Sequence, residues 1–503
     1  MTDQEPLTPA HEDDVPEQMR VRLDKRERLI SSGRGAYPIE VAQTRSLTQI
    51  REQYDSGDLE ADTRTGEVVS IAGRVIFLRN TGKLCFARLR EGNGAELQVM
   101  LSVADLGEEE LAEFKALVDI GDFLGVTGEV ITSRRGELSV QATSWVMVAK
   151  TLRPMPNEYR PLNDEARVRL RYVDMIVNSE ARDIVRVKAA VLKSLRGTLD
   201  DQSYLEVETP ILQLTNGGAA ARPFKTYLNA FDQEMLLRIA LELDLKKAMI
   251  GGVDRVYEIG RTFRNEGLDS THAAEFSMLE AYCAYGDINT MKALTRDLIL
   301  NAARVVGRTR IAGRNDEPID LEAPWRSVSM LELISEKVGE DIDSGTDLDT
   351  LKKHAANHGI ELQPHWNAGE VALELYEQLV EHTLIQPTFV EDYPESVRPL
   401  AKPHRDKPGL VEAFDLIING VELVAAYTEL NDPVIQRERL TEQSLLAAAG
   451  DPEAMDLDEA FLRAMEFGMP PAGGMGMGID RLVMLLTGVG IRESILFPLL
   501  RPE

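Results

Sequence analysis

The chain has 503 residues, a hydrophobic content of 43%, a formal net charge of −28 and only two cysteines. This length exceeds what a single hydrophobic core usually organises, so we expect two or three domains. The negative charge excludes a protein that coats nucleic-acid duplexes through a generally basic surface, whereas local basic segments stay compatible with a nucleic-acid partner. No apolar run reaches the roughly 18 to 20 residues of a membrane span.

The N-terminal region divides into a tail and a helical extension. Residues 1–18 are acidic and contain proline, which predicts a disordered tail and not a signal or transit peptide. We assign residues 19–64 to a helical extension, because Met19–Leu29 is a helix-like basic stretch. Cys85 and Cys283 lie far apart among apolar residues, which predicts two buried free thiols. These features favour a cytoplasmic protein.

Residues 65–150 have the pattern of a small β-domain, with a helix-like stretch between the third and fourth apolar runs. The runs are Val68–Leu78, Leu84–Arg90, Glu96–Leu101, Leu124–Thr132 and Leu138–Val148. Five strands in this order are typical of an OB-fold β-barrel, which commonly reads single-stranded nucleic acid. Phe86 alternates with charged neighbours, as a base-stacking ring would, although a core aromatic is the more common role.

A proline-containing linker and a larger domain follow. Residues 151–170 include Pro154, Pro156 and Pro161, which predict a stiff linker, and they extend the basic segment Lys150–Arg171. In the remaining part, 171–503, helical and strand patterns are mixed, as in an α+β domain. Helical spacing over Ala181–Asp200 leads into a strand that ends at Pro210. The stretch 287–398 is mostly helical and is predicted to be an insertion.

The stretch Val256–Tyr282 carries the densest chemistry. A strand-like run delivers Arg264 and Glu266, a polar loop follows, and a second run alternates so that Phe276, Met278, Glu280 and Tyr282 share one face. An arginine can brace a phosphate, an aromatic ring can stack on a purine, and carboxylates can hold a cation. The alternative is an ordinary hairpin with solvated charges.

Two further segments near the C-terminus suggest ligand contacts. Phe414–Glu422 predicts a hairpin around Asn419-Gly420 that brings Asp415 and Glu422 near each other, as a Mg²⁺ site beside bound phosphates or as solvent-facing charges. A glycine-rich run leads into a helix at Arg481. It lacks the Gly-Lys-Ser/Thr of a P-loop and the surroundings of a Rossmann turn, so we expect a strand-to-helix corner that approaches a ligand closely.

These motifs carry a resemblance to class II aminoacyl-tRNA synthetases over nearly the full chain. The three that define it are YLEVETP ending at Pro210, FRNEG with the following loop to EF, and GMGIDR ending at Arg481. GGAAARPF, LIQPTF and the N-terminal barrel make the chain most similar to the bacterial lysyl-tRNA synthetase family. The resemblance implies a homodimer built on an antiparallel sheet that uses ATP and Mg²⁺ to join lysine to tRNA-Lys.

The resemblance also assigns roles by position. For ATP it implies Arg264, Glu266, His272, Phe276 and Arg481, the two arginines being catalytic. For the amino acid it implies Gly218, Glu242, Glu280, Tyr282, Tyr427 and Glu429. For Mg²⁺ it implies Asp415 and Glu422. For the anticodon it implies Arg79, Phe86, Gln98 and Glu137 in the barrel.

Several residues around the expected pocket depart from the family pattern. They are Leu241, Asp244, Ala273, Val424, Ala425 and Ala426. Relatives typically have proline in place of Leu241, asparagine in place of Ala425 and glycine in place of Val424 and Ala426. We therefore expect a lost amide at Ala425 and added bulk in the pocket from Val424 and Ala426. Three functions therefore stay open: a lysine–tRNA ligase; a paralogue that adenylates lysine or a related amino acid for another acceptor or resists an inhibitor; and a catalytically silent tRNA-binding protein.

Overall fold

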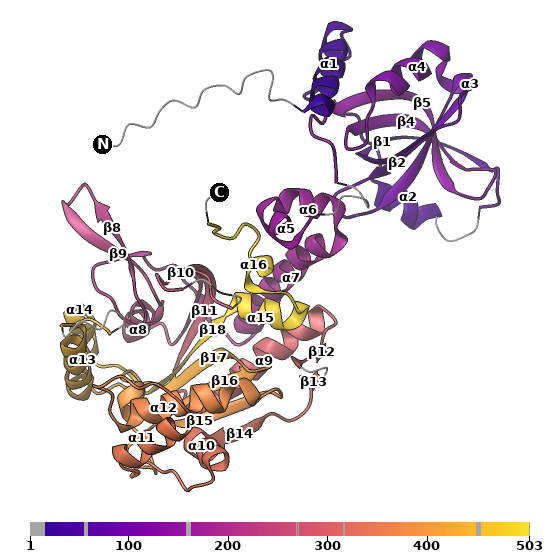
Figure 1. Ribbon diagram of the computed structural model, residues 1–503. Coiled ribbons are helices and arrows are strands. Elements are labelled where there is room, and N and C mark those ends of the chain that lie inside the picture. Colours follow the sequence, from indigo (N-terminus) through magenta and orange to yellow (C-terminus); the bar gives the residue numbers. More distant parts are fainter. Residues whose placement is uncertain are drawn as a thin grey trace. The chain divides into compact units, whose positions relative to one another are not determined.

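The computed structural model describes residues 16–54, 59–156, 162–267, 269, 271–314, 317–448 and 454–501. Most of the predicted tail lies outside the described residues, and Glu17 and Gln18 belong to the first helix. The chain forms two compact units, one of residues 1–163 with 172–179 and the other of residues 164–171 with 180–503. Figure 1 shows the elements of both.

The first unit contains a closed five-stranded barrel in the order β1-β2-β3-β5-β4. Its strands are β1 (Arg64–Asn80), β2 (Leu84–Arg90), β3 (Glu96–Ser102), β4 (Phe123–Thr132) and β5 (Leu138–Ala149), with α3 (Val103–Leu106) and α4 (Glu108–Leu117) between β3 and β4. Every second residue of β3 is buried, because strand side chains alternate between the core and the outer face. The predicted OB fold is confirmed.

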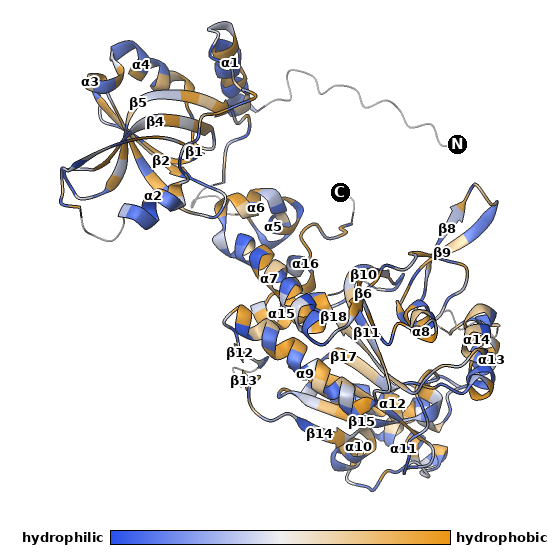
Figure 2. Cartoon of the chain, turned by 180° about the vertical axis from the view of Figure 1, so that it is seen from behind, coloured by the Kyte–Doolittle hydropathy of each residue, from blue (hydrophilic) through white to orange (hydrophobic). Residues whose placement is uncertain are grey.

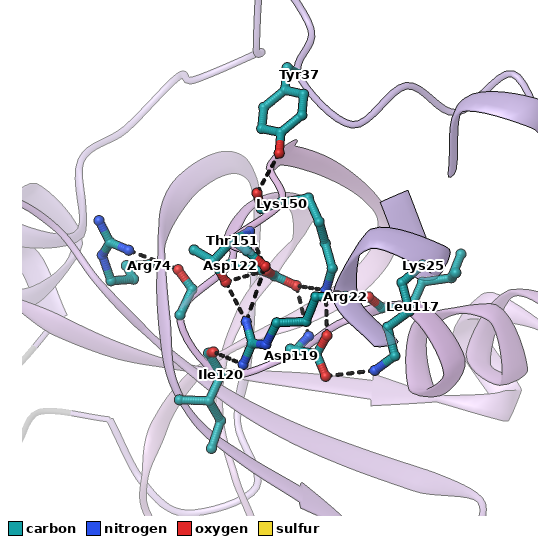
Figure 3. Close-up of polar contacts among 11 residues, drawn as sticks. Arg22, Lys25, Tyr37, Arg74, Leu117, Asp119, Ile120, Asp122, Lys150 and Thr151 are labelled. Carbon is teal, nitrogen blue, oxygen red and sulfur yellow. Dashed lines mark hydrogen bonds and ion pairs between the residues drawn. The ribbon is translucent and has the colours of Figure 1, made fainter. Parts of the chain in front are cut away.

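Basic residues anchor the N-terminal extension to this barrel. In α1 (Glu17–Ser31), Lys25 Nζ lies 2.6 Å from Asp119 Oδ1, and Arg22 Nη1 donates to Thr151 Oγ1 at 2.6 Å. The fully buried Lys150 ammonium lies 2.7 Å from Asp122 Oδ2, as Figure 3 shows. These three cations are held by groups of the barrel and by Thr151 directly after it, so they are less available for a nucleic-acid partner than the sequence indicates. The extension also contains α2 (Leu47–Tyr54).

The second unit is built on an eight-stranded sheet in the order β14-β15-β16-β17-β18-β11-β10-β6. The strands are β6 (Leu205–Glu206), β10 (Arg255–Phe263), β11 (Glu275–Ala284), β14 (Arg326–Ser329), β15 (Thr388–Pro394), β16 (Leu410–Ile418), β17 (Val421–Thr428) and β18 (Ala472–Gly478). Neighbours pair antiparallel except for β6 with β10 and β14 with β15. The predicted α+β domain on an antiparallel sheet is confirmed.

One face of this sheet is covered by helices. Apolar side chains of α7 (Ser179–Asp201), α9 (Ile288–Val305) and α15 (Ile479–Thr487) form one buried cluster with those of β16, β17 and β18. Figure 2 shows polar and apolar residues alternating along α9, as in a helix with one buried side. Because strand side chains alternate, the other face of β17, β18 and β11 is free to line a cavity.

The segment 287–398, predicted to be a helical insertion, is instead built into the domain. It supplies α9 to the core and β14 and β15 to the main sheet. Its other helices, α10 (Met330–Val338), α11 (Leu348–Asn357) and α12 (Ala368–Leu379), pack with β15 and β16 in a separate apolar cluster. Most of this segment has helical periodicity, so the sequence pattern did not reveal strands β14 and β15. These strands are stabilised by pairing with residues that are distant in the sequence.

Shorter elements complete the chain. The helices are α5 (Asp164–Arg169), α6 (Arg171–Val177), α8 (Glu242–Ile250), α13 (Pro433–Ala448), α14 (Glu459–Glu466) and α16 (Ile491–Ser494), and the strands are β7 (Leu212–Gln213), β8 (Phe224–Leu228), β9 (Gln233–Leu237), β12 (Arg310–Ala312) and β13 (Pro318–Asp320). Both cysteines are buried free thiols, as predicted. Across the described ranges, no helix has the length and apolarity needed to cross a membrane.

Candidate active site

A cavity of about 390 Å³ lies over the open face of β17, β18 and β11. Twelve of the residues predicted to bind ATP, amino acid or metal line it: Gly218, Glu242, Arg264, Glu266, His272, Phe276, Glu280, Tyr282, Glu422, Tyr427, Glu429 and Arg481. Met278 lines it as well, so the alternating residues of β11 share one face as expected. Arg264, Glu266 and Glu280 of the stretch Val256–Tyr282 therefore face a cavity, unlike the charges of an ordinary solvated hairpin.

One end of the cavity carries two arginines. Arg264 follows β10, and its guanidinium carbon lies 5.3 Å from the ring centroid of Phe276. Burial lowers the pKa of Arg264, as expected for a cation held away from water. Arg481, in the first turn of α15, donates from Nη1 to the Glu422 carbonyl at 2.7 Å. An arginine can bind phosphate oxygens in pairs, so this end suits a triphosphate.

His272 joins this end through a residue that the sequence did not single out. Arg481 Nη2 lies 3.2 Å from His272 Nε2, and His272 Nδ1 lies 2.8 Å from Asp269 Oδ2. A guanidinium only donates, so Nε2 accepts and Nδ1 carries the proton that it donates to Asp269. Burial raises the pKa of Asp269, but hydrogen bonds from Thr271 and His272 outbalance burial and hold that pKa far below its usual range. In the sequence, the three-residue spacing of Asp269 and His272 could have indicated this contact.

Another part of the cavity, called the acidic end below, contains Glu242, Glu280 and Glu429. Glu280 is buried; its Oε1 accepts the Leu241 N–H at 2.9 Å and its Oε2 accepts the Tyr282 hydroxyl at 3.0 Å. Burial, reinforced by the charge of Glu242, raises the pKa of Glu280 to about 7. Burial also raises the pKa of Glu429, although the Lys246 ammonium, whose Nζ lies 2.5 Å from Glu429 Oε2, opposes that rise. Buried carboxylates with spare acceptor capacity suit an ammonium ligand.

Gly474 allows the acidic end to form. A Cβ at this position of β18 would lie 2.1 Å from Glu429 Oε1 and 2.4 Å from Tyr282 Cε1, closer than any real contact. The glycine-rich run therefore makes space for two side chains of the cavity wall. Gly218, with φ of +84°, lines the same cavity in a conformation that other residues seldom adopt.

The departures from the family pattern fall in different places. Val424 and Ala426 are buried in the core on the helix-covered face, so the predicted crowding of the pocket by them is wrong. Ala425 and Ala273 do line the cavity, so the expected loss of an amide at Ala425 concerns a cavity residue. Asp244 pairs with Gln213 at 2.9 Å and does not line the cavity.

Leu241 contributes to the cavity through its backbone and not through its side chain. Its side chain is buried in the apolar cluster of α8 and α14, away from the cavity, while its N–H donates to Glu280. Proline has no N–H to donate, so this departure adds a hydrogen bond to a pocket carboxylate.

The predicted metal ligands are separated by the strand register. Asp415 pairs with Ala425, and Glu422 pairs with Ile417, so the two carboxylates are not directly opposite. Asp415 does not line the cavity; its Oδ2 lies 2.5 Å from Arg398 Nη2, while its buried Oδ1 has no partner. Burial raises the pKa of Asp415.

No group of three or more His, Cys, Asp or Glu side chains in the described ranges has the arrangement of a metal site. Mg²⁺ bound with a nucleotide usually needs only one or two carboxylates, the phosphates supplying further ligands. The spare buried oxygen of Asp415 and the cavity-facing Glu422 fit that requirement.

In the barrel, strand register brings three of the predicted anticodon residues to one face. Arg79 lies opposite Phe86, with its guanidinium carbon 4.6 Å from the ring centroid, and Gln98 lies opposite Arg88 on the next strand. The exposed Phe77 lies opposite Arg88 on the same face and was missed, because its neighbours are apolar. Glu137 is exposed just before β5.

Comparisons with known proteins agree with both parts. A family model for class II tRNA synthetases (D, K and N) matches residues 163–501, and a model for the OB-fold nucleic acid binding domain matches residues 69–148. The fold and the cavity are those of a class II tRNA synthetase.

Similar proteins show to which branch of that class the chain belongs. The chain is 51% identical to a lysine–tRNA ligase of Mycolicibacterium gilvum, over 98% of this chain and 99% of that protein. It is 52% identical to the lysine–tRNA ligase of Kineococcus radiotolerans, over 98% of both chains, and 48% identical to lysine–tRNA ligase 1 of Mycobacterium tuberculosis strain H37Rv, again over 98% of both chains. The chain belongs to the lysine–tRNA ligase family of class II tRNA synthetases.

Proposed function

We propose that this protein is a lysine–tRNA ligase, which activates lysine with ATP and transfers it to tRNA-Lys. The observation that carries the proposal is the single cavity with Arg264 and Arg481 at one end and Glu242, Glu280 and Glu429 at the other. The cationic end suits the phosphates of ATP, and the acidic end suits the two ammonium groups of lysine.

In the first step, an oxygen of the lysine carboxylate forms a bond to the α-phosphorus, and the bond from that phosphorus to pyrophosphate breaks. The carboxylate is already ionised and needs no general base, so alignment and charge neutralisation supply most of the rate. Arg264 holds the α-phosphate, Arg481 the γ-phosphate, and the adenine stacks on Phe276, with Glu266 and His272 assisting. In the second step, a ribose hydroxyl of tRNA attacks the acyl carbon, and AMP leaves.

Glu280, Tyr282 and Glu429 surround the ε-ammonium in this proposal, and Gly218 and Glu242 receive the α-amino group, with Tyr427 beside them. Asp415 and Glu422 would hold Mg²⁺ together with the phosphates. A bound Mg²⁺ would neutralise phosphate charge as pyrophosphate leaves.

The partners follow from the two parts of the chain. The barrel face with Arg79, Phe86 and Gln98, next to Glu137, reads the anticodon. A homodimer is supported by four exposed apolar side chains in and just after the first class motif, which follows α7: Leu205, Ile211, Leu212 and Leu214. The activity places the protein in the cytoplasm.

The test is amino-acid-dependent ATP–pyrophosphate exchange with each of the twenty amino acids, followed by charging of tRNA-Lys. We expect exchange with lysine above all others and charging of tRNA-Lys. Exchange with lysine but no charging would favour the paralogue with another acceptor. No exchange with any amino acid would favour the silent tRNA-binding protein.

A further inference from the structure

Lys246 lies behind the acidic end of the cavity and contacts it from inside the protein. Its side chain is fully buried in α8 and does not line the cavity. Its Nζ lies 2.6 Å from Glu242 Oε1 and 2.5 Å from Glu429 Oε2. Both carboxylates do line the cavity, so one ammonium joins two of its walls from the back.

The two carboxylates come from distant parts of the chain. Glu242 and Lys246 are four residues apart on α8, a spacing that places both side chains on one side of the helix. Glu429 directly follows β17 and is held by Lys246. Lys246 therefore fixes the position of Glu429 relative to α8.

The charges at this end of the cavity balance only when Lys246 is counted. Glu242, Glu280 and Glu429 carry three negative charges when ionised, and Lys246 balances one of them, whereas the charge of Arg398 is paired with Asp415. Lysine has two ammonium groups, and its carboxylate belongs at the end with Arg264. A buried charge without a partner is strongly unfavourable, so the pocket suits a ligand with two positive charges at this end.

We propose that Lys246 is a built-in counter-ion and positioning residue that matches the amino-acid pocket to a ligand with two ammonium groups. The proposal rests on the proposed lysine–tRNA ligase function. Lys246 does not touch the amino acid; it acts through Glu242 and Glu429.

Removing the ammonium changes the titration of the pocket. Burial raises the pKa of Glu429, the charge of Lys246 opposes that rise, and Glu242 and Glu280 add to it. Tyr282, Tyr427 and Arg398 also line the cavity, and Arg264 acts on Glu280 through its charge. Without Lys246, the carboxylates ionise at higher pH, so a smaller fraction of the protein can bind lysine at neutral pH.

The experiment compares Lys246→Met with the matched control Lys247→Met. Lys247, the next residue, is partly exposed and pairs with Asp244, which does not line the cavity. ATP–pyrophosphate exchange between pH 6 and pH 9 gives KM for lysine and for ATP. In the Lys246 variant we expect the lysine KM at pH 7 to rise about tenfold or more, and its pH dependence to move up by about one unit.

In the Lys246→Met variant the ATP KM should change by less than about twofold. In the Lys247→Met control, the KM values for lysine and for ATP should each change by less than about twofold. Equal changes in both KM values, an unmoved pH profile, or the same effect in the control would overturn the proposal.

Lys246→Arg keeps the proposal testable if the methionine variant does not fold. Arginine retains the charge, so the lysine KM should keep the wild-type pH dependence even where added bulk raises it. An upward pH shift in the arginine variant would overturn the counter-ion role. If the wild-type protein shows no lysine-dependent exchange, both the proposed function and the counter-ion role are overturned. If wild-type exchange is normal and the Lys246 variants are unaffected, only the counter-ion role is overturned.

Discussion

Glu280→Gln changes one charge at the centre of the acidic end and little else. The carboxylate is 3% exposed, and its Oε1 accepts the Leu241 N–H at 2.9 Å. The glutamine amide oxygen can accept the same hydrogen bond, and the size of the side chain is unchanged. The amide nitrogen replaces the oxygen that accepts the Tyr282 hydroxyl at 3.0 Å, and it can donate to that hydroxyl instead. The substitution therefore removes the counter-charge of an ammonium ligand while it preserves packing.

The expected effect is large for lysine and small for ATP. Removing one partner of a buried ion pair costs on the order of 3 kcal/mol, which corresponds to roughly a 150-fold loss in kcat/KM for lysine. The ATP KM should change by less than about threefold, since the phosphates are assigned to the arginine end. ATP–pyrophosphate exchange with either substrate varied gives both values.

Stability should change in the opposite direction. Burial raises the pKa of Glu280 from an ordinary value of 4.5 to about 7. A carboxyl whose pKa is raised in the folded state costs stability as pH rises from the unfolded value through the folded one, here from about 4.5 to above 7, by up to about 3 kcal/mol. Without lysine, Glu280→Gln should therefore unfold at a higher temperature than wild type at pH 8, and the difference should vanish near pH 4.5.

Two results would refute this reasoning. Equal losses for lysine and ATP would show that Glu280 shapes the whole cavity and does not serve the amino acid in particular. A lower unfolding temperature of the variant at pH 8 would show that the ionised carboxylate stabilises the empty protein, contrary to its burial.

Three other substitutions test separate parts of the molecule. Gly474→Ala places a Cβ 2.1 Å from Glu429 Oε1, so the lysine KM should rise on the order of tenfold with little change for ATP; an unchanged lysine KM would contradict the wall geometry. Asp122→Asn leaves the buried Lys150 ammonium with one carboxylate fewer and should lower the stability of the barrel by on the order of 3 kcal/mol in thermal unfolding, without altering ATP–pyrophosphate exchange. Phe86→Ala should reduce kcat/KM for tRNA charging by about 5- to 150-fold and leave exchange unchanged, and a parallel loss of exchange would argue against an anticodon role.

Local patterns in the sequence were sufficient for the elements and for most of the site. Alternation on β11 places Phe276 and Glu280 on one face whatever the rest of the chain does, because strand side chains alternate. The turn at Asn419-Gly420 similarly requires two residues with positive φ, and the structure has 58° and 68° there. The order of the five barrel strands and the three class motifs could also be read directly.

Tertiary structure decided which face each departure occupies and which charges meet. The sequence marked Val424, Ala425 and Ala426 as one altered run, but pairing with β16 and β18 directs only Ala425 to the cavity. The link from Lys246 to Glu429 joins residues far apart in the chain. No local pattern encodes such contacts, because they arise only when α8 and the end of β17 pack together.

The sequence by itself therefore determined the class of protein and the chemical types at each end of the cavity. Only the tertiary structure decided the net charge of the amino-acid pocket, because that charge depends on a buried ammonium behind its wall. It also decided that Leu241 supports Glu280 through a backbone N–H. Both outcomes depend on distances between atoms of separate elements, which folding alone fixes.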